Sequence, residues 1–164
     1  MGIWSCIGVI SPFPFYYFLW NNPQIWVDLC GRGRDPSRIM ALMSHFLKIV
    51  QFISLFPVTT LSWPPPFYFW PLFLFGQSLN FRVYQLLGES GTYYAVRFGK
   101  TVPWVTKFPF GIIKDPQYVG SIMSLVACLH WVPFLYIFLW VLGYVLMIKV
   151  ESDEDPSTRA KPLS

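Results

Sequence analysis

The longest apolar run of the chain is the feature that most limits its fold. It follows the turn at residues 114–120 and continues for about thirty residues to Val150. As one straight helix, this run would be on the order of 50 Å long, whereas the hydrocarbon core of a bilayer is roughly 30 Å thick. Pro133 lies near its middle, and proline breaks the helical hydrogen-bond ladder. We therefore expect a helical hairpin, with helices at 118–131 and 133–150.

A hairpin returns the chain to the membrane face from which it started. The acidic cluster at residues 151–155 should therefore lie beside the turn at residues 115–118. Negative charge is unfavourable at the C-terminus of a helix, because the helix dipole is negative there. Two explanations for the cluster stay open at this point: a bound cation, or the nearby basic side chains of Arg97, Lys107 and Lys114.

Three further apolar stretches are long enough to cross a bilayer. They cover residues 4–26, 39–63 and 67–87, and we expect the first to bend at Pro12 and Pro14. Hydrophobic residues make up 54% of the chain and charged residues only 12%, where about a quarter is usual in soluble domains. The sequence therefore predicts a single all-α domain over residues 1–164, a polytopic membrane protein with three transmembrane helices and a C-terminal helical hairpin.

The charged residues gather in segments that this topology places on one face. These segments are 28–38, 88–117 and the tail 151–164, while the opposite face receives only chargeless turns. Because Lys and Arg mark the cytoplasmic side, we expect these loops and the tail to be cytosolic. The aromatic and basic residues of 88–117 favour an amphipathic segment lying in the membrane interface. The net charge of +4 thus reflects orientation in the membrane, and no nucleic-acid partner is expected.

Few residues suggest a site when each is taken alone. The three cysteines are far apart in the sequence, so neither a disulfide framework nor a metal site is expected. The glycine turns at 31–34 and 88–91 do not follow a strand, which excludes a dinucleotide-binding fingerprint. Lys48 lies near the middle of a predicted span and should face the bundle interior, where it finds a partner or water. Gly76 would let a ligand or a neighbouring helix approach closely.

The order of several short motifs resembles that of the phospholipid N-methyltransferases. The order is a Gly-x-x-Gly-Thr-aromatic motif, Phe-Pro-Phe, Asp-Pro-x-Tyr-x-Gly-Ser, a long apolar run and an acidic cluster. The residues that carry it here are Gly88, Gly91, Thr92, Tyr93, Phe108, Pro109, Phe110, Asp115, Pro116, Tyr118, Gly120, Ser121 and residues 151–155. Segments 29–37 and 62–66 are similar to the plant members, so the resemblance covers essentially the whole chain.

The resemblance implies a reaction and a location. The reaction is methyl transfer from S-adenosyl-L-methionine to the amines of phosphatidyl-N-methylethanolamine and phosphatidyl-N,N-dimethylethanolamine, which ends in phosphatidylcholine. The bilayer would supply the phospholipid substrate. The implied location is the endoplasmic reticulum membrane, with a mitochondrial membrane as an additional location.

The resemblance also implies donor-binding residues. The family has a Gly-x-Gly motif in a membrane helix and a Glu-Glu pair after the last span. The Gly-x-Gly motif falls on residues 74–76, where only its second glycine, Gly76, is kept. For the Glu-Glu pair, Glu151-Ser152 and Glu154-Asp155 compete for the match. The residues expected to bind the donor are Leu74, Phe75, Gly76, Gly88, Gly91, Pro116, Gly120, Glu151, Ser152, Glu154 and Asp155.

The residue types suit this chemistry. Carboxylates pair with the ammonium group of the donor, and aromatic faces attract sulfonium and methylated ammonium cations. Tyr118 and Asp115 are the catalytic candidates, and either desolvation or Asp115 would assist loss of the proton from the amine. Arg97, Lys100, Lys107 and Trp104 are the residues expected to bind the lipid substrate.

Two alternatives stay open. Two positions depart from the family pattern: Leu74 replaces the first glycine of the Gly-x-Gly motif, and Ala95 stands where many relatives have glycine. These departures are compatible with a non-catalytic scaffold or lipid-binding protein that keeps the fold. A prenylcysteine carboxyl methyltransferase shares the hairpin and the x-Pro-x-Tyr-x-Gly turn.

Overall fold

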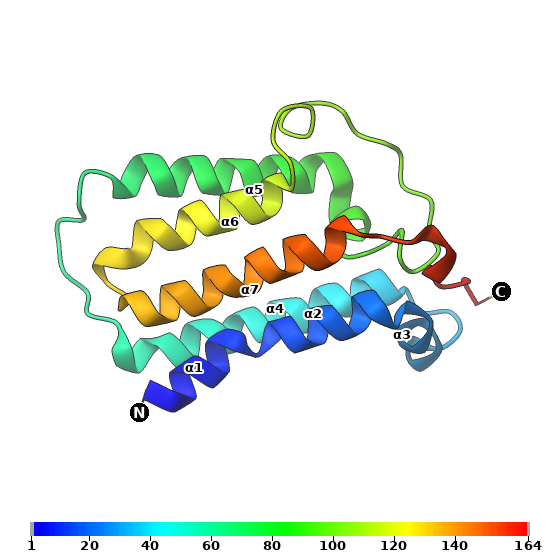
Figure 1. The fold of residues 1–164 in the computed structure, drawn as a ribbon, viewed down its shortest axis with the longest axis horizontal. Coiled ribbons are helices and arrows are strands. Elements are labelled where there is room, and N and C mark those ends of the chain that lie inside the picture. Colours follow the sequence, from blue (N-terminus) through cyan, green and yellow to red (C-terminus); the bar gives the residue numbers. More distant parts are fainter. Residues whose placement is uncertain (1, 164) are drawn as a thin grey trace.

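The protein is an elongated bundle of helices in the computed structural model, which describes residues 2–163. No strand occurs within these residues, which confirms the all-α prediction. The helices run roughly along the long axis of the bundle, and the N-terminus lies at the end opposite the C-terminal tail (Figure 1). In chain order the helices are α1 (Gly2–Ile10), α2 (Pro12–Asn21), α3 (Pro23–Cys30), α4 (Pro36–Leu55), η1 (Phe56–Val58), α5 (Phe69–Thr92), α6 (Pro116–Ala127), η2 (Cys128–His130), α7 (Phe134–Ser152) and η3 (Pro156–Thr158).

The predicted C-terminal hairpin is present. The helices α6 and η2 form its first arm and α7 its second, and the chain turns between them just before Pro133. Pro116 is the first residue of α6, where a missing backbone N–H costs nothing. The hairpin returns residue 151 to the end of the bundle where α6 begins, as expected from the length of the apolar run (Figure 1).

The N-terminal apolar stretch, predicted as one span over residues 4–26, is divided into α1, α2 and the start of α3. The first break falls at Ser11–Pro12, next to the predicted bend at Pro12, but α1 and α2 follow nearly one line (Figure 1), and Pro14 lies within α2. The side chain of Gln51 is fully buried, and its Nε2 donates to the carbonyl oxygen of Val9 at 2.7 Å. Gln51 therefore provides a partner for a carbonyl next to the break, since an unpaired buried carbonyl would be costly.

Among the residues that the structure describes, three segments are long and apolar enough to cross a membrane: Gly2–Asn21, Pro36–Val58 and Phe134–Ser152. They agree with the first and second predicted spans and with the second arm of the hairpin. The helix α5 covers the predicted third span and is long enough to cross, but it carries Gln77, Asn80 and Arg82. Its crossing of the membrane therefore stays a prediction, as do the exact limits of the other spans.

Many large apolar residues lie on the outside of the bundle, and several polar residues are buried inside it beside the apolar core. On α4, for example, Leu42, Ile49 and Ile53 are exposed, whereas Ser44 and Gln51 are buried. Such a surface suits hydrocarbon, because lipid does not penalise exposed apolar side chains.

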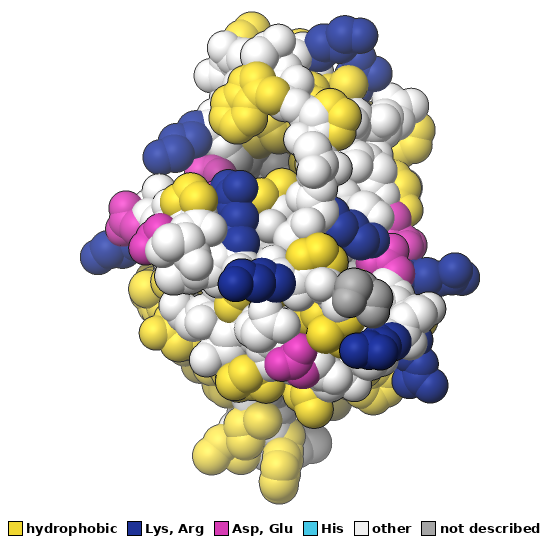
Figure 2. Space-filling view, turned by 90° about the vertical axis from the view of Figure 1, so that its right-hand side faces the viewer, with side chains coloured by type: hydrophobic (Ala, Val, Ile, Leu, Met, Phe, Trp, Pro, Cys, Tyr) yellow, Lys and Arg dark blue, Asp and Glu magenta, His cyan; other side chains and the backbone are white. Residues whose placement is uncertain are grey.

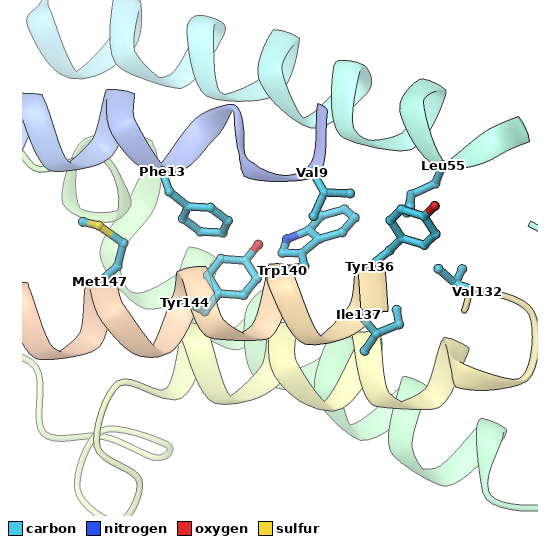
Figure 3. Packing of buried hydrophobic residues seen from close by; sticks show 9 residues of the cluster. All are labelled: Val9, Phe13, Leu55, Val132, Tyr136, Ile137, Trp140, Tyr144 and Met147. Atoms are coloured by element: carbon cyan, nitrogen blue, oxygen red, sulfur yellow. The ribbon is translucent and has the colours of Figure 1, made fainter. Parts of the chain in front are cut away.

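An aromatic core joins α1, α2 and α4 to α7. Trp140, Tyr144 and Tyr136 of α7 lie between their own helix and the N-terminal helices (Figure 3). The ring of Phe13 packs edge-on against Tyr144, with centroids 5.4 Å apart, and it also fits against the backbone at Gly143, where a Cβ would clash with it. This packing fixes the face of α7 that Tyr144 and Trp140 present to the rest of the bundle.

A different contact joins α5 to α6, the most extensive in the bundle. Gly76 and Gly120 face each other, and a Cβ on either would lie 2.5 Å from the carbonyl oxygen of the other. The side chains of Gln77 and Ser124 are hydrogen-bonded beside them at 2.8 Å. Small residues let two helix backbones approach closely, as in many membrane bundles.

Charged side chains gather at one end of the bundle. Figure 2 views this end and shows Lys and Arg together with Asp and Glu over its surface. The connection from α5 to α6 and the C-terminal tail meet here (Figure 1). Residues 100–115 form no regular helix, and Trp104 and Ile112 are strongly exposed, so the position of this segment in the membrane interface stays a prediction. The turns that form the opposite end, at residues 59–68 and 128–133, carry no Lys, Arg, Asp or Glu.

Candidate functional site

Two cavities lie next to each other in the bundle, and the larger extends from the charged end toward the opposite end. The larger has a volume of about 460 Å³ and is lined by α4, α5, α6 and α7, with Tyr16 from α2. The smaller has a volume of about 230 Å³ and lies at the charged end itself. The cavities share four lining residues, which are Thr92, Tyr94, Gln117 and Tyr118. We call this group the shared wall.

The shared wall is held by a carboxylate. The hydroxyls of Tyr94 and Tyr118 both donate to Oε1 of Glu151, the latter at 2.5 Å. Tyr118 lies in the first turn of α6, Glu151 in the last turn of α7, and Tyr94 in the turn after α5. Three segments distant in the sequence therefore converge on one oxygen atom. Burial raises the pKa of Tyr94 well above its ordinary value, so this phenol stays protonated and donates to the carboxylate.

Two residues at this end have left-handed backbones without being glycine. They are Tyr94 (φ 56°) and Asp115 (φ 51°), and both line the smaller cavity. Residues other than glycine adopt this conformation rarely, and aromatic residues more rarely than Asp. Such strain is typical of functional sites, where the surroundings hold a residue in place for its role.

The smaller cavity is rich in carboxylates. Asp115, Glu151 and Glu154 all line it, with Arg97 as a basic neighbour. Burial raises the pKa of Asp115, while nearby Lys114 partly offsets this. The hydrogen bond from Arg159 lowers the pKa of Glu154, so this residue remains a carboxylate at neutral pH. An excess of carboxylates beside aromatic rings favours a cationic ligand in this cavity.

Arg97 is used to hold the C-terminal tail. It is only 3% exposed, and its guanidinium lies over the ring of Trp20 at 4.8 Å. It donates to the carbonyl oxygen of Trp20, to Oγ1 of Thr158 at 2.8 Å and to the carbonyl oxygen of Asp155. Oε1 of Glu154 lies 3.8 Å from its Nη1. Most of its donors are therefore already bound within the chain.

The larger cavity contains the mid-span lysine. Nζ of Lys48 donates to the hydroxyl of Tyr144 at 2.8 Å and lies 4.9 Å from the ring centre of Trp140. The exposed side chains of His45, Gln77 and Tyr84 also line this cavity, so it reaches the outer surface between α4 and α5. The prediction that Lys48 faces the bundle interior is confirmed.

The comparison with known families now has a structural context. The sequence model of one family, described as phospholipid methyltransferase, matches residues 68–159. This range is more than half of the chain and includes the shared wall, Glu151 and the carboxylates of the smaller cavity.

The chain belongs to the phospholipid methyltransferase family.

The chain is also 70% identical, over all of its 164 residues and the full length of the relative, to a phosphatidyl-N-methylethanolamine N-methyltransferase of Arabidopsis thaliana. No solved structure matches it. Membership of this family makes the chain an enzyme of phospholipid methylation, which favours a phospholipid N-methyltransferase over a non-catalytic scaffold.

Several of the residues predicted for this phospholipid methyltransferase meet at the smaller cavity. Of the expected donor-binding and catalytic residues, those that line it are Gly91, Asp115, Pro116, Tyr118, Glu151 and Glu154. Between the two acidic pairs, Glu151 reaches the shared wall and Glu154 faces Arg97 and Arg159, whereas Ser152 and Asp155 are exposed and line neither cavity. Gly88 has φ 67° and interrupts α5, which directs the chain into the turn that carries Tyr94.

Other predicted residues lie elsewhere. Leu74 and Phe75 are 56% and 48% exposed on the outer face of α5. Gly76 and Gly120 lie in the helix contact described above and line neither cavity. A donor-binding role for these four residues stays a prediction, and the geometry gives them a packing role or a lipid-facing surface.

The predicted lipid-binding residues are also dispersed. Nζ of Lys100 pairs with Oδ1 of Asp35 at 2.5 Å, Lys107 is exposed, and Trp104 is 92% exposed. Of the four, only Arg97 lines a cavity. Sequence reasoning missed Tyr94, Gln117 and Tyr144 as cavity residues; the left-handed turn at Tyr94 leaves no pattern in the sequence, because glycine is absent there.

Proposed function

We propose that the enzyme transfers methyl groups from S-adenosyl-L-methionine to phosphatidyl-N-methylethanolamine and phosphatidyl-N,N-dimethylethanolamine, forming phosphatidylcholine. The observation that carries this proposal is the shared wall, where a carboxylate-rich cavity at the charged end meets a cavity that opens toward the bilayer. A reaction between a water-soluble cation and a lipid needs two such compartments with a common boundary. The Arabidopsis relative is a phosphatidyl-N-methylethanolamine N-methyltransferase, which supports the choice of acceptor lipid.

The residues of the smaller cavity fit the donor. Their carboxylates, Glu151, Glu154 and Asp115, would hold its ammonium group, and the rings of Tyr118 and Tyr94 would lie against its cationic part. When bound, the donor supplies an electrophilic methyl group. The protein holds the two ligands in place relative to each other. Glu151 fixes the phenols of Tyr94 and Tyr118, and these phenols form the boundary at which the donor and the lipid meet.

The amine of the lipid has to lose a proton before it attacks. Glu151 accepts from two phenols of the shared wall, Asp115 lies two residues before Gln117 of that wall, and Tyr118 lies between the cavities. We propose that Tyr118 orients the amine and that one of these carboxylates accepts the proton. The endoplasmic reticulum membrane, with the charged end in the cytosol, is the proposed location.

Labelled methyl transfer tests the proposal. Purified protein in lipid nanodiscs would be incubated with methyl-labelled donor and, in separate reactions, the unmethylated, monomethylated and dimethylated lipids. We expect labelled phosphatidylcholine from the dimethylated lipid, and from the monomethylated lipid after two transfers. Failure to label either lipid, in a preparation that binds the donor saturably, would refute the proposal. Labelling of a farnesyl-cysteine analogue instead would favour the prenylcysteine alternative.

A further inference from the structure

The larger cavity contains a cation for which the protein supplies no counter-ion. Within residues 2–163, no carboxylate lies within ion-pair distance of Lys48. Its neighbours are the Tyr144 hydroxyl and the rings of Trp140 and Tyr144, at 4.9 and 5.4 Å from Nζ. Aromatic faces and one hydroxyl hold the ammonium group in a fixed place, but they leave its charge uncompensated and leave hydrogen-bond donors unused.

Because Lys48 lies deep in a predicted span, its uncompensated charge costs free energy unless a ligand pairs with it. Lys48 is twelve residues after Pro36, about 18 Å along α4 from the charged end. Lysines in spans are rare at such depth and usually mark the path of a substrate. The ammonium group of Lys48 is thus left for a ligand with acceptor atoms.

The cavity changes character along the bundle axis. The shared wall closes it toward the charged end, Lys48 and Tyr144 lie below the wall, and Phe52 and Phe73 line the deeper part. Tyr144 connects the shared wall to Lys48, because its hydroxyl accepts from Lys48 and its ring lies 5.5 Å from that of Tyr118 in the wall. From the charged end inward, a ligand would therefore meet tyrosines, then a cation, then apolar rings.

We infer that Lys48 binds the phosphodiester of the lipid substrate and so orients its amine toward the shared wall. A phospholipid of the ethanolamine series presents, in the same order, an amine, a phosphate and apolar chains. The phosphate attracts Lys48 and the ammonium is repelled by it, so only one orientation satisfies both charges. The chains leave between α4 and α5, where the cavity reaches the surface. This inference rests on the proposed function for the identity of the lipid.

Steady-state kinetics of Lys48→Met test the assignment, with the KM for lipid and the KM for donor measured separately. We expect the lipid KM to rise about tenfold or more, because removal of one member of a buried charge pair leaves the other unpaired, while the donor KM stays the same. Lys48→Arg should keep most of the affinity for lipid. Lys149→Met is the matched control, since Lys149 is exposed near the end of α7 and lines neither cavity.

A binding experiment covers the case in which Lys48→Met does not fold. Phosphatidylcholine and an ether analogue that carries the same choline group without phosphate would compete against a photoreactive phospholipid on the wild-type protein. We expect the phosphate-free analogue to compete about tenfold more weakly. Equal competition by the two lipids would overturn the inference, and so would a donor KM that rises with the lipid KM in Lys48→Met, because the anion would then belong to the donor. Binding needs no turnover, so an inactive wild-type protein would count against the proposed function alone.

Discussion

The two ends of the bundle are held together by different kinds of contact. At the charged end, Glu151 joins α7 to α6 and to the turn after α5, while Arg97 joins that turn to α2 and the tail. At the opposite end, the turns are joined by bonds near the surface, such as that from the Thr60 N–H to the Trp131 carbonyl oxygen at 3.0 Å and those of Ser62 with His130 and Trp131. Both ends therefore join segments that are distant in the sequence, but the charged end does so through carboxylate and guanidinium groups that line a cavity. The charged end is where substitutions should affect catalysis most.

Glu151→Gln should have the largest effect. The amide keeps the size of the side chain but removes the charge on which both phenols converge, so we expect turnover to fall by about 100-fold or more. Methyl transfer and donor binding would be measured together, and donor affinity should fall more than lipid affinity. Asp153→Asn is the matched control, because Asp153 is two residues away, exposed and outside both cavities. Equal losses in the two variants would make the acidic cluster a general charge effect.

Arg97→Met should have the next largest effect, which is a loss of stability. Loss of the guanidinium frees the tail and leaves the Trp20 carbonyl and Glu154 with fewer partners, which should cost about 3 kcal/mol. Thermal unfolding in detergent would measure this, with Arg34→Met as an exposed control. An unchanged midpoint, combined with a raised lipid KM, would show instead that Arg97 binds lipid phosphate, as the sequence predicted.

Gly76→Ala tests the contact between α5 and α6. A methyl group at this position would lie 2.5 Å from the Gly120 carbonyl oxygen, so the helices have to separate, at a cost of roughly 1–3 kcal/mol. The comparison is with Ser78→Ala, on the exposed face of the same helix. If Gly76 binds the donor instead of packing, the substitution should weaken donor binding at unchanged thermal stability.

The pH dependence of the tail should be smaller than any of these effects. Arg159 lowers the pKa of Glu154 from its ordinary value of 4.5, so the folded state binds this proton less readily than the unfolded chain. The resulting stabilisation is present above pH 4.5 and is lost as the pH falls through the lower, folded value. The stability difference between wild type and Glu154→Gln should therefore shrink in acid. A difference that is constant with pH would contradict this.

Ser62→Ala, at the opposite end, should have the smallest effect. It removes the bond to Nε2 of His130 at 2.7 Å, which is exposed, so the change in stability should stay within about 0.5 kcal/mol. Methyl transfer should be unaffected. A loss of activity comparable to that of Glu151→Gln would mean that the two ends are not as distinct as the contacts indicate.

The hairpin could be predicted because its apolar run is too long for one upright span and Pro133 interrupts the helical hydrogen bonds near its middle. The break at Pro12 and the inward direction of Lys48 followed in the same way, from proline geometry and from the cost of a charge in hydrocarbon. The wall residue Tyr94 could not be predicted, because its left-handed conformation is imposed by contacts with Glu151 and not by its own preference. Arg97 was assigned to lipid for its charge, but the fold surrounds it with carbonyl groups of its own chain.

The shared wall has one further consequence. Since Tyr94 and Tyr118 line both cavities, we expect that, under the proposed function, occupancy of one cavity changes the affinity of the other without any helix having to move. Such linkage is reciprocal by thermodynamic necessity. Whatever factor a saturating phospholipid applies to the donor's dissociation constant, saturating donor will apply to that of the phospholipid, and a single pair of equilibrium titrations measures it.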